Sequence, residues 1–210
     1  MKFVVLSKVL VASILMSLFA ASNAFAGDAQ NGEKLSQTCL GCHGAPGLRN
    51  PGPVYEIPVV GGQHADYIVS ALKAYRSKER GHKTMQAQAS NLSDQDMQDI
   101  AAFFATIEGQ ARPSNTNALS AARGQEKSAV CASCHGNTGN GDNTAYPKLA
   151  GQYESYLEQA LKDYRSGERS NAIMAGFSAN LTIEDIRDLS AWFAQQEGDL
   201  VAPKSVIFKF

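Results

Sequence analysis

Apolar residues recur at helical spacing in two separate parts of the chain. Between residues 67 and 75, and again between 156 and 164, they follow the order i, i+1, i+4, i+5 and i+8, which places them on one helix face. Strand-like alternation of apolar and polar residues is absent around both. The pattern therefore predicts an all-α protein. The two stripes consist of Tyr67, Ile68, Ala71, Leu72 and Tyr75, and of Tyr156, Leu157, Ala160, Leu161 and Tyr164.

Each stripe lies between two further predicted helices. Residues 28–38 and 120–130 are typical of a first helix. A last helix begins after a Ser or Thr that an Asp follows three residues later, which resembles a capping box with Asp in place of Glu. The expected N-caps are Asp28 and Ser120 for the first helices, and Ser93 (with Asp96) and Thr182 (with Asp185) for the last.

The chain contains two copies of one unit. When it is aligned with itself, both C-x-x-C-H segments coincide, and the match continues to the last helix. The first copy has a longer loop at residues 45–53, which is rich in Gly and Pro. Residues outside the motif also coincide: Gly32 with Gly124, Pro58 with Pro147, Gly62-Gln63 with Gly151-Gln152, Tyr75-Arg76 with Tyr164-Arg165, Glu79-Arg80 with Glu168-Arg169, Met85 with Met174, and Leu92 with Leu181.

This repeat predicts two tandem helical domains. Each has on the order of 90 residues, a size at which a protein core alone gives marginal stability, so a large apolar cofactor would complete each core. A polar, turn-prone stretch separates them. The expected division is a signal peptide at 1–26, an N-terminal domain at 27–110, a linker at 111–119, a C-terminal domain at 120–198 and a tail at 199–210.

The start of the chain has the layout of a cleaved signal peptide. Lys2 and Lys8 precede an apolar run from Val9 to Ala20, and Ala24-Phe25-Ala26 forms a small-residue cleavage site. The alternative is an uncleaved anchor, but the run is shorter than the roughly 20 residues that span a bilayer. The 210 residues carry a formal net charge of −1, so no basic surface is available to bind nucleic acid. We expect an exported, periplasmic protein without nucleic-acid partners.

The cysteines predict the cofactor. They occur as Cys39-Leu40-Gly41-Cys42-His43 and as Cys131-Ala132-Ser133-Cys134-His135, both with the C-x-x-C-H pattern of c-type haem attachment. The two thiols add to the two vinyl groups of one haem edge, and the following histidine reaches the iron from below the ring. The sequence therefore predicts two covalent haem c groups, attached at Cys39, Cys42, Cys131 and Cys134 and ligated by His43 and His135.

Three other uses of the cysteines are weaker. A redox dithiol belongs in a βαβ context, which is missing here. A zinc site shared by both pairs would leave the two histidines and the duplication of a whole domain as coincidences. A disulfide framework does not require a histidine after each pair.

The methionines indicate the sixth ligand. Met1 and Met16 lie in the signal peptide, and Met97 falls on the apolar stripe of a last helix, opposite Ile186 in the repeat, as core packing does. Met85 and Met174 coincide in the repeat and lie in polar stretches. Ligation by His and Met raises the reduction potential and fills the position that a substrate would need. We therefore expect Met85 and Met174 as axial ligands.

Other repeated residues have two interpretations each. Pro58 and Pro147 are either carbonyl acceptors for the histidine ring or simple turn residues. The glutamines, tyrosines and arginines of the repeat are candidates for binding haem propionates. For the tyrosines, packing on the apolar stripe is favoured instead, and for the arginines a solvated face. His64 and His82 are not repeated and are expected at the surface. The propionate candidates are Gln63, Gln152, Tyr75, Tyr164, Arg76 and Arg165.

The sequence resembles the dihaem cytochromes c4 over essentially all of residues 27–195. The resemblance rests on the duplicated C-x-x-C-H, on Pro-x-x-x-Gly-Gln at residues 58–63 and 147–152, and on Tyr-Arg-Ser-x-Glu-Arg before each methionine. It implies two class I cytochrome c domains related by a pseudo-two-fold axis, with His43–Met85 and His135–Met174 ligation. It also implies a periplasmic one-electron carrier of a respiratory chain.

The resemblance implies redox proteins as partners: a membrane quinol-oxidising complex or another donor, and a terminal oxidase as acceptor. An enzyme such as a dihaem peroxidase, and equally a ligand sensor, would need an iron with an open position, which two methionines argue against. A fixed haem subunit of a larger complex is a second alternative. The alternating apolar tail fits packing over the domain interface, peripheral contact with a membrane, or contact with a partner.

Overall fold

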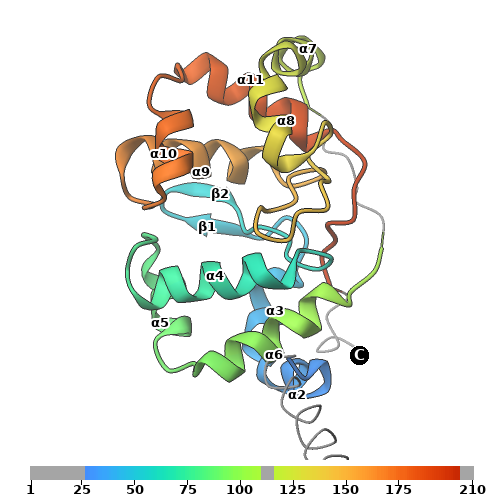
Figure 1. Ribbon diagram of the computed structural model, residues 1–210, viewed down its shortest axis with the longest axis vertical. Helices are drawn as coiled ribbons and strands as arrows, with labels where there is room; N and C mark the ends of the chain where they lie inside the picture. The colour runs from blue at the N-terminus through green and yellow to red at the C-terminus, as the bar shows by residue number, and fades with distance from the viewer. Residues whose placement is uncertain (1–26, 110–115, 204–210) are drawn as a thin grey trace, which may run out of the picture.

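The computed structural model describes residues 27–109 and 116–203, which form two stacked helical units (Figure 1). The elements of each unit follow the same order, apart from a small hairpin in the first. The N-terminal unit contains α2 (Ala29–Leu35), α3 (Gln37–His43), β1 (Arg49–Pro51), β2 (Val54–Glu56), α4 (Ala65–Arg76), α5 (Lys83–Ala89) and α6 (Asp94–Ala105). The C-terminal unit contains α7 (Ala118–Lys127), α8 (Ala129–His135), α9 (Glu154–Ser166), α10 (Ala172–Ser178) and α11 (Ile183–Ala194). Within the described ranges, no helix combines the length and apolarity needed to cross a membrane.

Side-chain caps fix where the helices begin. Both expected capping boxes are present, since Ser93 and Thr182 each accept from the backbone N–H three residues on. Asp28 caps α2 as predicted. The prediction of Ser120 as the cap of α7 was wrong, because the Asn117 side chain accepts from the Leu119 and Ser120 N–H groups and starts the helix earlier.

The all-α prediction is confirmed, and the described residues add only a small hairpin to it. In the longer loop of the first unit, β1 and β2 pair antiparallel, with Arg49 opposite Glu56. The hairpin lies between the two units, next to α9 (Figure 1). There the Glu56 N–H donates to Ser155 Oγ at 2.9 Å. The extra loop therefore contributes to the contact between the units, a role that its turn-rich composition did not show.

The first and last helix of each unit cross at a glycine. A Cβ on Gly32 would lie 1.9 Å from the Asp99 carbonyl oxygen, and a Cβ on Gly124 would lie 2.0 Å from that of Asp188. The two crossings differ in the polar groups beside them. Asp99 accepts from uncharged groups, Asn31 among them, whereas Asp188 binds Arg123 and Lys127. The repeated glycines are therefore required for the close approach of α2 to α6 and of α7 to α11.

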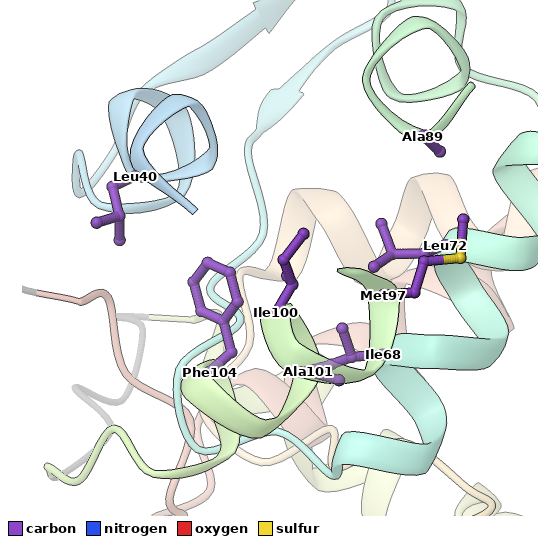
Figure 2. Close-up of a cluster of buried hydrophobic side chains, with 8 residues drawn as sticks. All are labelled: Leu40, Ile68, Leu72, Ala89, Met97, Ile100, Ala101 and Phe104. Carbon is purple, nitrogen blue, oxygen red and sulfur yellow. The ribbon is translucent and has the colours of Figure 1, made fainter. Parts of the chain in front are cut away.

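The N-terminal core lies between α3, α4, α5 and α6 (Figure 2). Met97 is fully buried there, as expected for a packing residue rather than a ligand. Its counterpart in the repeat, Ile186, is buried in the same way. The cluster consists of Leu40, Ile68, Leu72, Ala89, Met97, Ile100, Ala101 and Phe104.

The segment after α11 crosses back to the N-terminal unit. Leu200 is buried, and Val201 pairs antiparallel with Gly61 through two backbone hydrogen bonds of 3.0 and 3.1 Å. In Figure 1 the dark red end of the chain runs along the side of both units. Of the three roles considered for residues 199–210, the described part therefore has the first, packing across the two units. Residues 204–210 lie outside the described ranges.

The helix crossing gives a first prediction. Gly124→Ala places a methyl group against the backbone of α11, so α7 must move away, and we expect the free energy of unfolding to fall by about 3 kcal/mol. The measurement is urea-induced unfolding followed by the fluorescence of Trp192, the single tryptophan of the chain. Gly176→Ala is the matched control, because nothing lies within 4 Å of the added Cβ in α10. Equal midpoints for the two variants would contradict the role of Gly124.

Candidate haem sites

The predicted haem-binding residues of both units line one cavity of about 930 Å³. The two motifs reach it from α3 and α8, and Met85 and Met174 reach it from α5 and α10. None of the four cysteines is paired in a disulfide. Burial raises the pKa of the Cys39 and Cys131 thiols, so both remain protonated near neutral pH. The structure thus brings together every residue that the sequence selected for haem attachment and ligation.

A backbone carbonyl orients the histidine of each motif. His43 Nδ1 donates to the Pro58 carbonyl at 2.8 Å, and His135 Nδ1 donates to the Pro147 carbonyl at 2.8 Å. Since Nδ1 carries the proton, Nε2 keeps the lone pair that a metal requires. Burial lowers the pKa of both imidazoles, which favours this neutral form. Of the two interpretations of the prolines, the structure supports the carbonyl acceptor.

Each methionine lies in the first turn of a capped helix. His82 Nδ1 accepts from the Met85 N–H at 3.2 Å, and Asn171 Oδ1 accepts from the Met174 N–H at 3.0 Å. The expectation that His82 is an ordinary surface residue was therefore wrong. His82 and Asn171 occupy the same place in the repeat and share one function with different side chains. The sequence signal for these caps is a side chain that can accept a hydrogen bond, placed three residues before each methionine.

His64 also has a defined role, contrary to its expected place at the surface. Its Nε2 donates to the Gly141 carbonyl of the C-terminal unit at 2.8 Å. In the repeat this position is Tyr153, whose hydroxyl accepts from the Gly47 N–H of the N-terminal unit at 3.0 Å. Both side chains therefore join the two units, although the residue type is not repeated.

The repeated glutamines hold the backbone of the opposite unit. Gln152 accepts from the Val59 N–H at 3.1 Å and donates to the Val59 carbonyl at 2.9 Å. Gln63 makes the same pair of bonds to Lys148, at 2.9 and 3.1 Å. Both side chains are buried. Because Val59 and Lys148 directly follow the two prolines, each glutamine fixes the backbone that orients the other unit's histidine. In this structure the glutamines serve the interface rather than propionates.

The other propionate candidates also contact protein groups. Arg76 donates to the Leu92 carbonyl at 2.9 Å, and Arg165 donates to the Leu181 carbonyl at 2.7 Å. Each hydrogen bond joins the end of a middle helix (α4 or α9) to the loop before the last helix (α6 or α11). The rings of Tyr75 and Tyr164 pack under guanidinium groups of neighbouring arginines. The tyrosines therefore pack, as favoured from the sequence. Arg76 and Arg165 do more than form a solvated face, because each makes a defined hydrogen bond to a loop carbonyl.

The rims of the two halves of the cavity differ. At equivalent positions of the repeat, the N-terminal half has Thr38, Thr84 and Gln88, and the C-terminal half has Val130, Ile173 and Phe177. All of these side chains are exposed at the rim. Solvent access and polarity near a haem influence its reduction potential, and the two halves of the cavity differ in this respect.

The cavity fits haem better than it fits the alternative cofactors of a C-x-x-C pair. In residues 27–109 and 116–203, no three His, Cys, Asp or Glu side chains gather to hold a metal ion, so the two pairs do not form a zinc site. The lining is instead largely apolar, with Ile68, Leu157 and Phe193 among its residues. Thiols, a neutral imidazole and a thioether in an apolar pocket are the donor set of a c-type haem site.

Two helical units that each bring a C-x-x-C-H segment and a methionine to a shared cavity define a two-domain c-type cytochrome. The comparisons agree, since the model of the family "Cytochrome c" matches residues 29–108 and 121–197. The chain is 32% identical over 209 residues to cytochrome c4 of Stutzerimonas stutzeri, covering 89% of this chain and 98% of that protein. The chain therefore belongs to the cytochrome c family and, within it, to the cytochromes c4.

Two further similarities support the assignment. Cytochrome c4 of Azotobacter vinelandii is 40% identical over 188 residues, covering 80% of this chain and 88% of that protein. The crystal structure of reduced recombinant cytochrome c4 from Pseudomonas stutzeri matches with a TM-score of 0.69 and 29% identity, over 81% of this chain and 100% of that one. The chain is thus an electron-transfer protein rather than an enzyme. It binds two haem c groups covalently and exchanges electrons with redox partners.

The glutamine contacts give a second prediction. Gln152→Ala leaves the buried N–H and C=O of Val59 without partners, so we expect the free energy of unfolding to fall by about 1–3 kcal/mol. Gln63→Ala should have a similar effect, because its contact with Lys148 is equivalent. Urea titration of the haem-loaded protein measures the change. Gln125→Ala, at an exposed position of α7, is the control; a loss no larger than in this control would refute the role of the glutamines.

Proposed function

We propose that this chain is a periplasmic carrier of a respiratory chain that delivers single electrons towards a terminal oxidase. We further propose that residues 1–26 are a signal peptide, which is cleaved on export. The linker between the two cytochrome c domains, expected at residues 111–119, then ends before α7 begins at Ala118. The cytochrome c4 relatives support the carrier role. The basic and apolar start of the sequence supports export.

The residues of the cavity have distinct proposed roles. Cys39 and Cys42 hold one haem through thioether bonds, and Cys131 and Cys134 hold the other. His43 with Met85, and His135 with Met174, are the axial ligands of the two irons. The observation that carries this proposal is the presence of one histidine and one methionine from each unit in the same cavity.

This arrangement suits electron transfer better than catalysis. When bound, the haem iron supplies a one-electron ferrous–ferric couple. With haem bound, the imidazoles that Pro58 and Pro147 orient and the methionines that lie in capped helices would fill both axial positions of each iron. Ligands that stay in place during a change of oxidation state keep the reorganisation small. A small substrate then finds no open position at either iron.

A third prediction concerns the methionines. Met85→Ala and Met174→Ala should each leave haem attached, open one iron, and lower its reduction potential by on the order of 0.1 V or more, within the roughly 0.8 V range that axial ligands set. The measurements are haem staining after denaturing electrophoresis, the absorption change on adding carbon monoxide to the reduced protein, and a redox titration.

Met97→Leu is the matched control, because Met97 is fully buried in the core. It should leave the potentials unchanged, and neither it nor the unaltered protein should bind carbon monoxide. If the potentials of the Met85 and Met174 variants equalled that of the Met97 variant, the ligand assignment would be wrong. A spectral shift of the unaltered protein with carbon monoxide would bring back the enzyme and sensor interpretations.

The acceptor gives a fourth prediction. The reduced, haem-loaded protein should be oxidised by a purified haem–copper terminal oxidase, with a rate that rises with the concentration of the oxidase. Stopped-flow absorbance measures this rate, and cyanide-inhibited oxidase is the control. Oxidation no faster than by dissolved oxygen alone would rule out direct delivery to that type of oxidase.

A further inference from the structure

The last helices of the two domains differ by one hydroxyl group on the face that serves the haem cavity. Three residues of α11 line the cavity, and their order of i, i+1 and i+4 places them on one helix face. The equivalent residues of α6 are all apolar (Figure 2). The two sets differ in polarity at a single position. They are Leu189, Ser190 and Phe193 in α11, and Ile100, Ala101 and Phe104 in α6.

The hydroxyl of Ser190 is buried without a partner. The residue is 1% exposed, and its Oγ makes no hydrogen bond within residues 27–109 and 116–203. A serine inside a helix often donates to a carbonyl of the preceding turn, as Ser178 does to Ala175 at 3.3 Å. Ser190 does not make this bond. Because burial of a hydroxyl without a partner is costly, its position favours a bound group that supplies one.

The surroundings of Ser190 narrow the choice of partner. Its neighbours on the cavity face of α11 are Leu189 and Phe193, and Phe193 packs with Leu157 of α9. A water molecule needs two to four polar partners, which these side chains do not provide. A haem in the cavity presents an electron-rich ring, which accepts a weak hydrogen bond as other aromatic faces do. The haem of the C-terminal domain is therefore the partner that this position favours.

We propose that Ser190 is a tuning residue of the C-terminal haem, whose hydroxyl donates to the ring and raises the reduction potential of that iron. The positive end of the O–H dipole then points at the ring, which favours the ferrous form because this form carries one more electron. Ala101 has no dipole to offer the N-terminal haem, so the effect is confined to one domain. The proposal rests on the haem of the C-terminal domain, and not on the electron acceptor or on the axial ligands.

Removal of the hydroxyl tests the proposal. Ser190→Ala should lower one midpoint potential and leave the other unchanged. For a weak hydrogen bond we expect about a threefold change in the ferrous-to-ferric ratio, which is roughly 30 mV at about 59 mV per tenfold for a one-electron couple. The measurement is a redox titration of the haem-loaded protein, fitted to two one-electron steps. A rise, an unchanged pair of potentials, or equal shifts of both steps would overturn the proposal.

Ser36→Ala is the matched control. Ser36 is as buried as Ser190, and its hydroxyl is likewise without a partner in the described part of the chain. It lies between α2 and α3 and does not line the cavity. Its removal should leave both potentials unchanged. Shifts as large as those of Ser190→Ala would assign the effect to a general loosening of the packing and refute the role of Ser190.

Two further variants separate the hydroxyl from the volume of the side chain. Ser190→Thr and Ser190→Val add the same methyl branch and have nearly the same shape, but only threonine has a hydroxyl. The affected potential should be higher in Ser190→Thr than in Ser190→Val by about the amount that Ser190→Ala loses. Equal potentials would show that the hydroxyl has no effect. If neither variant takes up haem, the comparison of Ser190→Ala with Ser36→Ala decides the question.

Proton NMR of the oxidised protein identifies the haem that responds. The unpaired electron of each ferric iron displaces the methyl signals of its haem, and nuclear Overhauser contacts with the ring of Phe193 or Phe104 assign each set to a domain, since both rings line the cavity. In Ser190→Ala the set in contact with Phe193 should move, and the set in contact with Phe104 should stay in place. Movement of the Phe104 set alone would contradict the proposal.

Discussion

The amide of Gln152 holds the backbone beside Pro58, and the carbonyl of Pro58 orients the ring of His43. An equivalent chain of contacts runs from Gln63 to Lys148 and, through the neighbouring proline, to His135. Buried backbone groups need such partners, because an unsatisfied N–H or C=O is costly. The orientation of each proposed ligand imidazole therefore depends in part on a side chain of the other domain. The motif residues and the methionine of each site come from one domain, and the other domain supplies the glutamine that holds the backbone beside the proline.

Local and repeated patterns carried most of what could be predicted from the sequence. The capping residues Ser93 and Thr182 act within one helical turn, so their role is written in a few neighbouring residues. Met85 and Met174 were separated from Met97 because they coincide in the repeat, and the structure places both on the haem cavity. The all-α class followed from the apolar stripes, with the small hairpin as its exception.

Contacts between the domains could not be predicted in the same way. His82 and Asn171 share the capping function although their side chains differ, so comparison by residue type hid the relation. The partner of His64 depends on how the two units dock, which no local pattern contains. Arg80 and Arg169 were visible as a repeated pair, but their burial against each other emerges only when both domains are in place.

The pairing of Val201 with Gly61 has a consequence for the integrity of the molecule. The C-terminal domain is connected to the N-terminal one through residues 110–115 and also through this returning segment. Cleavage of the chain between the domains would leave two fragments that the strand pairing, the hairpin and the glutamines still hold together. The effective concentration of one fragment near the other would remain high while these contacts persist. A nicked molecule would therefore behave as a non-covalent heterodimer.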